Sequence, residues 1–181
     1  MQLVDALHPR RALVLPAATV AAPLAYFVLR DAGRSGSLGL DHAALLCGSL
    51  VAGYLAAAGL CSVLDGERIA GAHWLADRAV HPGTATLAVF GSVVLGAGAY
   101  LVAAMAGGVP SIVSTLVTPV GTLLGLPLVV LYGGLVVVGN AVGFEPALAW
   151  QAAVVGVGVA LSVLWTFALC ASLTRLVAPS E

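Results

Sequence analysis

The sequence has little charge and no lysine. Of its 181 residues, 8% are charged and 61% are hydrophobic, and the mean hydropathy is +1.09. Because soluble domains carry about 25% charged residues, this chain cannot cover its surface with polar side chains, and we expect lipid to be its solvent. The net charge of −1, without an arginine-rich stripe, argues against nucleic acid as a partner. All seven basic residues are arginine, which we interpret as the genomic bias of a prokaryote with GC-rich DNA.

Cysteine is scarce, and its spacing does not indicate a metal site or a local disulfide. Cys47, Cys61 and Cys170 all lie in apolar runs, without a CxxC or a Cys/His metal-binding pattern. Cys47 and Cys61 share one predicted helix and are about 21 Å apart along its axis, too far to bridge within it. We interpret the three as small apolar packing residues. The sequence also lacks a P-loop, a nucleophile elbow and an HExxH motif.

Long uncharged runs predict the fold class. The hydrocarbon core of a bilayer needs about 20 apolar residues in helical form, and five runs meet this length, namely residues 12–29, 43–64, 84–106, 119–142 and 147–173. The first run follows two arginines, as in a signal peptide, but it is long for one and no small-x-small cleavage site follows it. We therefore predict an all-α fold, a polytopic transmembrane bundle of about five spans in a single integral membrane domain, residues 1–181.

The stretch 111–142 is too long for one span. Its 32 uncharged residues would form a helix of about 48 Å, whereas the hydrocarbon core is about 30 Å thick. We favour a short interfacial or re-entrant piece, Ser111–Val117, followed by Thr118 as N-cap and Pro119 at the first position of a new helix. The main alternative is a helix broken at Gly125–Pro127.

The arginines favour a cytoplasmic N-terminus in the cell membrane. With five spans and the N-terminus inside, the inner side holds Arg10, Arg11, Arg68 and Arg78. The outer side then holds Arg30, Arg34 and Arg175. One span more or fewer within residues 111–142 would move the C-terminal end to the other side.

The one substantial polar insert, residues 65–83, predicts an amphipathic helix over residues 67–81. Apolar residues such as Leu75 and Ala79 share one face, and His73, Asp77 and His81 share the other. Such a helix suits the membrane interface, with Trp74 at its edge.

His73, Asp77 and His81 are the candidate metal ligands. Two imidazoles and a carboxylate suit zinc or iron, but positions i and i+8 lie about 12 Å apart, so all three converge only if the helix bends or ends early. Further ligands would have to come from Asp65, Glu67, His42 or Glu145. The alternative is a solvated polar face without metal. No other cofactor is expected.

Glycine spacing suggests contacts between helices. The pairs Gly121/Gly125 and Gly139/Gly143 match the small-xxx-small pattern, which allows close approach of helix backbones in lipid. The pattern fits packing within the bundle, and it also fits a homo-oligomer or other membrane subunits as partners, besides membrane lipid.

The segment from Cys61 to Phe90, CSVLDGERIAGAHWLADRAVHPGTATLAVF, runs in the order apolar span, Asp-Gly, amphipathic helix and new span. In this order it resembles uncharacterised prokaryotic multi-pass membrane families, including the membrane domain attached to some glycerophosphoryl diester phosphodiesterases. The resemblance implies a helical bundle with a cytoplasmic amphipathic helix between the second and third spans. It carries no catalytic residue over to this chain.

Three classes of function remain open. A non-enzymatic accessory or assembly subunit is our leading expectation. A small channel or transporter for a neutral or apolar substrate is the second, because broken helices such as 111–142 often line binding sites. A metal-dependent membrane enzyme that uses His73, Asp77 and His81 is the third.

Overall fold

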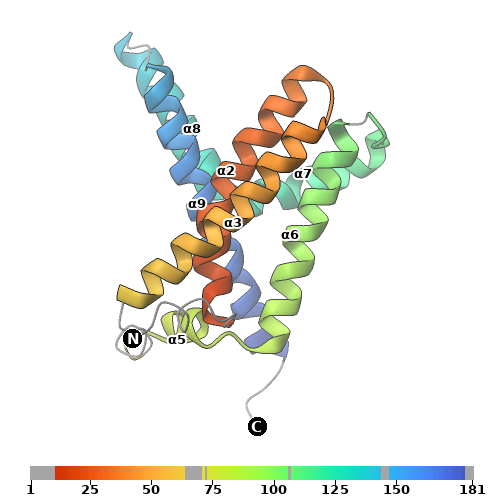
Figure 1. The fold of residues 1–181 in the computed structure, drawn as a ribbon. Helices are drawn as coiled ribbons and strands as arrows, with labels where there is room; N and C mark the ends of the chain where they lie inside the picture. The colour runs from red at the N-terminus through yellow and green to blue at the C-terminus, as the bar shows by residue number, and fades with distance from the viewer. Residues whose placement is uncertain (1–10, 64–70, 72, 106, 144–146, 178–181) are drawn as a thin grey trace.

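The computed structural model describes residues 11–63, 71, 73–105, 107–143 and 147–177, and this part of the chain is helical apart from its turns and loops (Figure 1). The all-α prediction is confirmed. In chain order the elements are η1 (Arg11–Leu13), α2 (Val14–Ser35), α3 (Leu40–Val63), α5 (Trp74–Val80), α6 (Thr84–Met105), α7 (Ser111–Leu124), α8 (Leu126–Val142) and α9 (Leu148–Val177).

Helices α2 and α3 form an antiparallel hairpin with a very close approach. A Cβ added at Gly53 of α3 would lie 2.7 Å from the carbonyl oxygen of Ala17 and 2.7 Å from the Cβ of Ala21, both on α2. Glycine is therefore the residue that lets the two backbones meet, as is common where lipid provides no hydrophobic drive between helices. Next to the turn that joins the two helices, His42 Nε2 of α3 lies 3.6 Å from Asp31 Oδ2 of α2.

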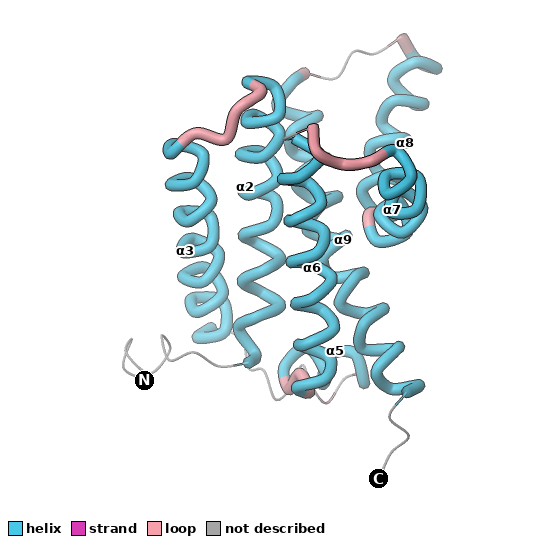
Figure 2. The backbone as a smooth tube through the Cα atoms, turned by 90° about the vertical axis from the view of Figure 1, so that its right-hand side faces the viewer, coloured by secondary structure: helices cyan, strands magenta, loops and turns pink. Residues whose placement is uncertain are grey.

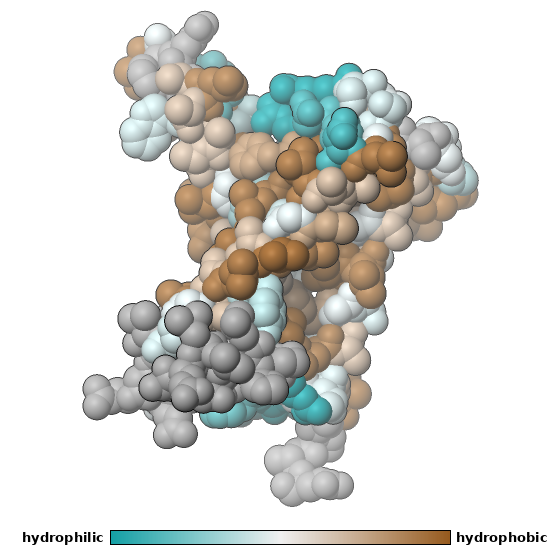
Figure 3. Space-filling model, viewed as in Figure 1, coloured by the Kyte–Doolittle hydropathy of each residue, from teal (hydrophilic) through white to brown (hydrophobic). Residues whose placement is uncertain are grey.

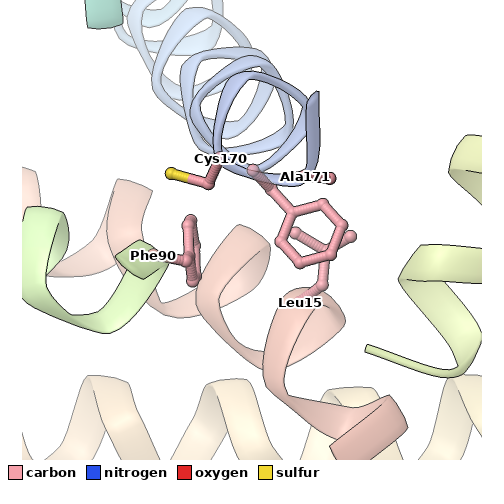
Figure 4. Close-up of a cluster of buried hydrophobic side chains, with 5 residues drawn as sticks. Leu15, Phe90, Cys170 and Ala171 are labelled. Atoms are coloured by element: carbon pink, nitrogen blue, oxygen red, sulfur yellow. The ribbon is translucent and has the colours of Figure 1, made fainter. Parts of the chain in front are cut away.

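A small apolar cluster joins four helices at the opposite end of the molecule (Figure 4). Its buried members are Leu15 of α2, Phe90 of α6, and Phe167, Cys170 and Ala171 of α9. The rings of Phe90 and Phe167 meet edge to face with centroids 5.5 Å apart, a favoured aromatic geometry. Leu75 and Ala79 of α5 pack against the same cluster, so α5 is fixed to the bundle.

The face shown in Figure 3 is apolar over the middle of the molecule, whereas hydrophilic residues gather at the turn between α2 and α3 and near the opposite end. Four helical stretches are long and apolar enough to cross a membrane: Arg11–Ser35, Leu40–Ser62, Thr84–Ala104 and Leu148–Val177. The prediction of several membrane-compatible helices is confirmed.

The fourth predicted span, residues 119–142, is not one helix. Helix α7 runs from Ser111 through Thr118 and Pro119 to Leu124, and the chain then bends by 82° into α8. Our preferred boundary at Thr118 is therefore wrong, because the Thr118 hydroxyl donates to the Ser114 carbonyl within α7 and does not cap a new helix. The break at Gly125–Pro127 is correct, and Pro127 stands in the first turn of α8, where a missing N–H is tolerated.

The bent pair α7–α8 begins and ends at the same end of the molecule. Figure 1 shows α7 running across the other helices, and Figure 2, turned by 90°, shows it nearly end-on. In both views the α6–α7 loop and the last turn of α8 lie at the α2–α3 turn's end of the molecule, opposite α5. The pair would be a fifth span only if it crossed the membrane as one unit.

Candidate functional site

The structure gives the three predicted metal ligands different backbone states. His73 is not helical: its backbone is extended (φ −160°, ψ 147°), and its Nδ1 accepts the Leu75 N–H at 3.2 Å as the N-cap of α5. The predicted helix over residues 67–81 is therefore wrong at His73, and residues 64–70 and 72 lie outside the described part. Asp77 lies within α5, and His81 follows its last turn.

Of the three, only Asp77 and His81 come together. His81 Nδ1 lies 3.2 Å from Asp77 Oδ1, and the His81 backbone N–H donates to the Asp77 carbonyl at 2.7 Å. Both side chains are more than half exposed. Among the described residues no group of three His, Cys, Asp or Glu is placed to hold a metal ion.

The suggested extra ligands do not complete this group within the described chain. His42 lies in the first turn of α3, next to the α2–α3 turn and at the opposite end of the molecule from α5, so it cannot join His73, Asp77 and His81 (Figure 1). Asp65, Glu67 and Glu145 lie outside the described residues, and the metal site remains a prediction that depends on them.

Helix α5 sits at a corner where η1, α6 and α9 meet. The guanidinium of Arg175 on α9 lies 5.2 Å from the centroid of the Trp74 ring, within the range of a cation–π contact. Nearby, the buried Thr86 of α6 is hydrogen-bonded to Thr174 of α9 at 3.0 Å. Because the Thr174 hydroxyl already donates to the carbonyls of Cys170 or Ala171, Thr86 is the donor.

A second site, which the sequence reading missed, is the helix break and its support on α9. Trp165 Nε1 donates to the Leu123 carbonyl at 3.0 Å, before the break. After the break, the Leu128 N–H donates to Ser162 Oγ at 3.3 Å. Broken helices survive at membrane depth only when neighbouring groups satisfy the freed backbone, and α9 supplies one donor and one acceptor for this purpose.

Gly158 allows α8 to pack closely against α9, next to Ser162 and Trp165. A Cβ at Gly158 would lie 2.9 Å from the Leu128 Cα and 2.7 Å from its Cδ1. Gly158, Ser162 and Trp165 follow one another at i, i+4 and i+7, so they share one face of α9. We call these three residues the α9 clamp. The sequence signal that could have indicated it is the small-xxx-small pair Gly158/Ser162, but nothing in the sequence says which helix it meets.

Helix α7 carries a row of hydroxyls. Ser111, Thr115, Thr118 and Thr122 are spaced by three or four residues and are all exposed. The hydroxyls of Thr115, Thr118 and Thr122 donate to the carbonyls of Ser111, Ser114 and Thr118, respectively. Their donor hydrogens are thus satisfied, and their oxygen lone pairs remain available as acceptors.

Three of the four glycines in the two predicted small-xxx-small pairs serve helix ends or internal packing in this fold, whereas a Cβ at Gly121 would meet nothing within 4 Å. Gly125 stands at the break, and Gly143 ends α8 with a left-handed backbone (φ 68°), which favours glycine. Gly139 is buried within the chain.

Comparison with protein-family models, with curated proteins and with solved structures finds no match to this chain. The fold class therefore rests on the structure itself, and the resemblance of residues 61–90 to multi-pass membrane families stays a prediction.

Proposed function

We propose that this protein is a non-enzymatic accessory or assembly subunit of the cell membrane, which works by binding other transmembrane helices through the outer face of α6. The observation that carries the proposal is the sparse packing of α6 combined with glycines on its free face.

Helix α6 is the least buried of the four candidate spans. Only 6% of its 18-residue apolar stretch is buried within the chain, compared with 28% of the corresponding stretch in α9. Phe90 and Thr86 hold it to the bundle near its start, whereas Leu95, about half a turn from that packing face, is 74% exposed. A helix held on one side alone leaves most of its surface for lipid or for another helix.

The glycines of α6 favour another helix. Where helices of this chain cross closely, glycine stands at the contact, as Gly53 and Gly158 show. Gly91 and Gly98 are seven residues apart on one face of α6, yet a Cβ at either would meet nothing within 4 Å. Glycine inside a helix costs about 1 kcal/mol relative to alanine, a cost that close helix packing offsets and contact with lipid does not. The partner is a second copy or another membrane subunit.

Arginine placement supports a cytoplasmic N-terminus. With α7–α8 as a re-entrant pair, the chain crosses four times, and Arg175 joins Arg11 and Arg78 at one end. Arg30 and Arg34 lie at the other end (Figure 1). The excess of three described arginines over two supports a cytoplasmic location of the α5 end under the positive-inside rule.

Photo-crosslinking in native membranes tests the proposal. A photoreactive residue at Leu95 is expected to give a discrete protein adduct, and one at Val157 of α9, 55% exposed, serves as the matched control. Gly91→Val combined with Gly98→Val should abolish the Leu95 adduct and leave the fold intact, because a Cβ added at either position would meet nothing within 4 Å. Lipid adducts alone at Leu95, or an adduct unaffected by both substitutions, would contradict the proposal.

A channel for small neutral solutes is the second candidate, and the hydroxyl row of α7 beside an 82° helix bend favours it. Glycerol flux into vesicles containing the purified protein tests it. Thr118→Val with Thr122→Val should lower that flux several-fold, whereas Ile112→Val, on the apolar face of α7, should leave it unchanged. Flux no greater than in empty vesicles would exclude this function.

A further inference from the structure

Three arginines lie within one helical turn, along the chain, of residues that form the apolar cluster or pack against it. Arg11 precedes Leu15 of the cluster by one helical turn, and Arg175 follows Ala171 of the cluster by one turn. Arg78 adjoins a third contributor, Ala79 of α5, which packs against the cluster. The three cations come from η1, α5 and α9, and α5 touches both of the other elements. The fold thus brings together charges that lie far apart in the sequence.

These arginines lack carboxylate partners within the described chain. The ion pairs among the described residues join His42 to Asp31 and His81 to Asp77, and none involves a guanidinium. Arg11 and Arg175 are exposed, and Arg78 is partly exposed. Clustered arginines attract anions, and their planar donors suit phosphate oxygens.

Trp74 places this cluster at the level of lipid headgroups. Trp74 is 38% exposed and its ring lies under the Arg175 guanidinium, while the next residue, Leu75, packs against the apolar cluster. Tryptophan prefers the membrane–water interface, where one edge meets lipid chains and the other meets water. The stacked ring also limits the freedom of Arg175, so less conformational entropy is lost when a ligand binds.

We infer that Arg11, Arg78 and Arg175 bind the phosphodiester headgroup of an anionic phospholipid, such as phosphatidylglycerol, with Trp74 beneath the headgroup. Each arginine at a negatively charged membrane surface contributes about fivefold to the binding constant, so the three together contribute on the order of 100-fold. This inference does not depend on the proposed partner of α6, since the corner lies near the start of that helix and away from Leu95.

Native mass spectrometry of the purified full chain tests the inference, with thermal stability measured in parallel. Phosphatidylglycerol should remain bound to the wild type and raise its Tm, whereas phosphatidylcholine should do neither. The triple variant Arg11→Gln, Arg78→Gln, Arg175→Gln should lose the bound lipid and the shift in Tm. The control Arg30→Gln with Arg34→Gln, at the other end of the molecule, should keep both.

Three results would overturn the inference: equal retention of phosphatidylcholine, undiminished retention of phosphatidylglycerol by the triple variant, or the same shift in Tm with inorganic phosphate alone. The last result would identify a soluble anion as the ligand. If the triple variant does not fold in phosphatidylcholine, the single variants decide. Arg175→Gln and Arg78→Gln should each lower the fraction of lipid-bound protein several-fold, and no change in either would reject the site.

Discussion

Trp165 and Leu123 lie 42 residues apart in the sequence, and the indole Nε1 of Trp165 donates a 3.0 Å hydrogen bond to the Leu123 carbonyl. This bond satisfies a backbone group released by the break between α7 and α8. It links the bend to α9, the longest helix in the described part of the chain, which contacts α2, α5, α6, α7 and α8 (Figure 1).

Trp165→Phe keeps an aromatic ring and removes this donor. We expect it to lower the free energy of unfolding by about 0.5–1.5 kcal/mol, the usual contribution of one hydrogen bond. Unfolding of the purified protein in mixed micelles with increasing dodecyl sulfate measures the change. Trp150→Phe, at a 66% exposed position of the same helix, should have little effect. Equal losses for both variants would mean that the Leu123 contact does not stabilise the bend.

Gly158→Ala adds a methyl group that would lie 2.9 Å from the Leu128 Cα, which is backbone and cannot rotate away. We expect α8 to shift from the α9 clamp, at a cost of about 1–3 kcal/mol of unfolding free energy. Gly156→Ala, two residues earlier, is the matched control, because its Cβ meets only the Phe27 ring edge at 3.8 Å. That variant should be neutral or gain up to about 1 kcal/mol from helix propensity. The same micelle titration compares the two, and a stable Gly158→Ala protein would argue against close contact between α8 and α9.

The Thr86–Thr174 hydrogen bond ties α6 to α9 and suits a double-mutant cycle. Thr86→Val removes the donor in a fully buried position and should cost about 1 kcal/mol of unfolding free energy. The coupling energy between Thr86→Val and Thr174→Val should be about 0.5–1.5 kcal/mol. Additive effects of the two substitutions would show that the hydroxyls do not interact in the membrane.

The sequence predicted the long apolar helices well and the helix break poorly, for a physical reason. Long uncharged runs locate α2, α3, α6 and α9 because hydropathy is a local property. Thr118 followed by Pro119 is a good local start signal, yet α7 continues through it. The break occurs instead at Gly125, where Ser162 and Trp165 of α9 stabilise the freed backbone. The two hydrogen-bonded pairs are 34 and 42 residues apart in the sequence, so a local pattern does not reveal them.

The same holds for the candidate sites: local features were predicted from the sequence, and contacts between distant segments were not. The sequence correctly placed Leu75 and Ala79 on an apolar face, but the face packs against protein, because Phe90 and Phe167 build a cluster that α5 can cover. Helical periodicity put His73 in line with Asp77 and His81, whereas His73 uses its ring to cap α5. The contact between Arg175 and Trp74 could not be predicted from the sequence. The predicted topology of five spans would have placed Arg175 on the other side of the membrane from Trp74.

The topology of the α7–α8 pair is the central claim, because it decides where Arg175 lies. Cysteine labelling with a membrane-impermeant reagent tests it in a background where Cys47, Cys61 and Cys170 are replaced by alanine. Single cysteines at Ser37, Gly108 and Val142 should all react from outside intact cells, and a cysteine at Val177 should react only after permeabilisation. Reaction at Ser37 and Gly108 with protection at Val142 would mean that the pair crosses the membrane. The re-entrant arrangement, the charge count and the shared side of Arg11 and Arg175 would then be wrong.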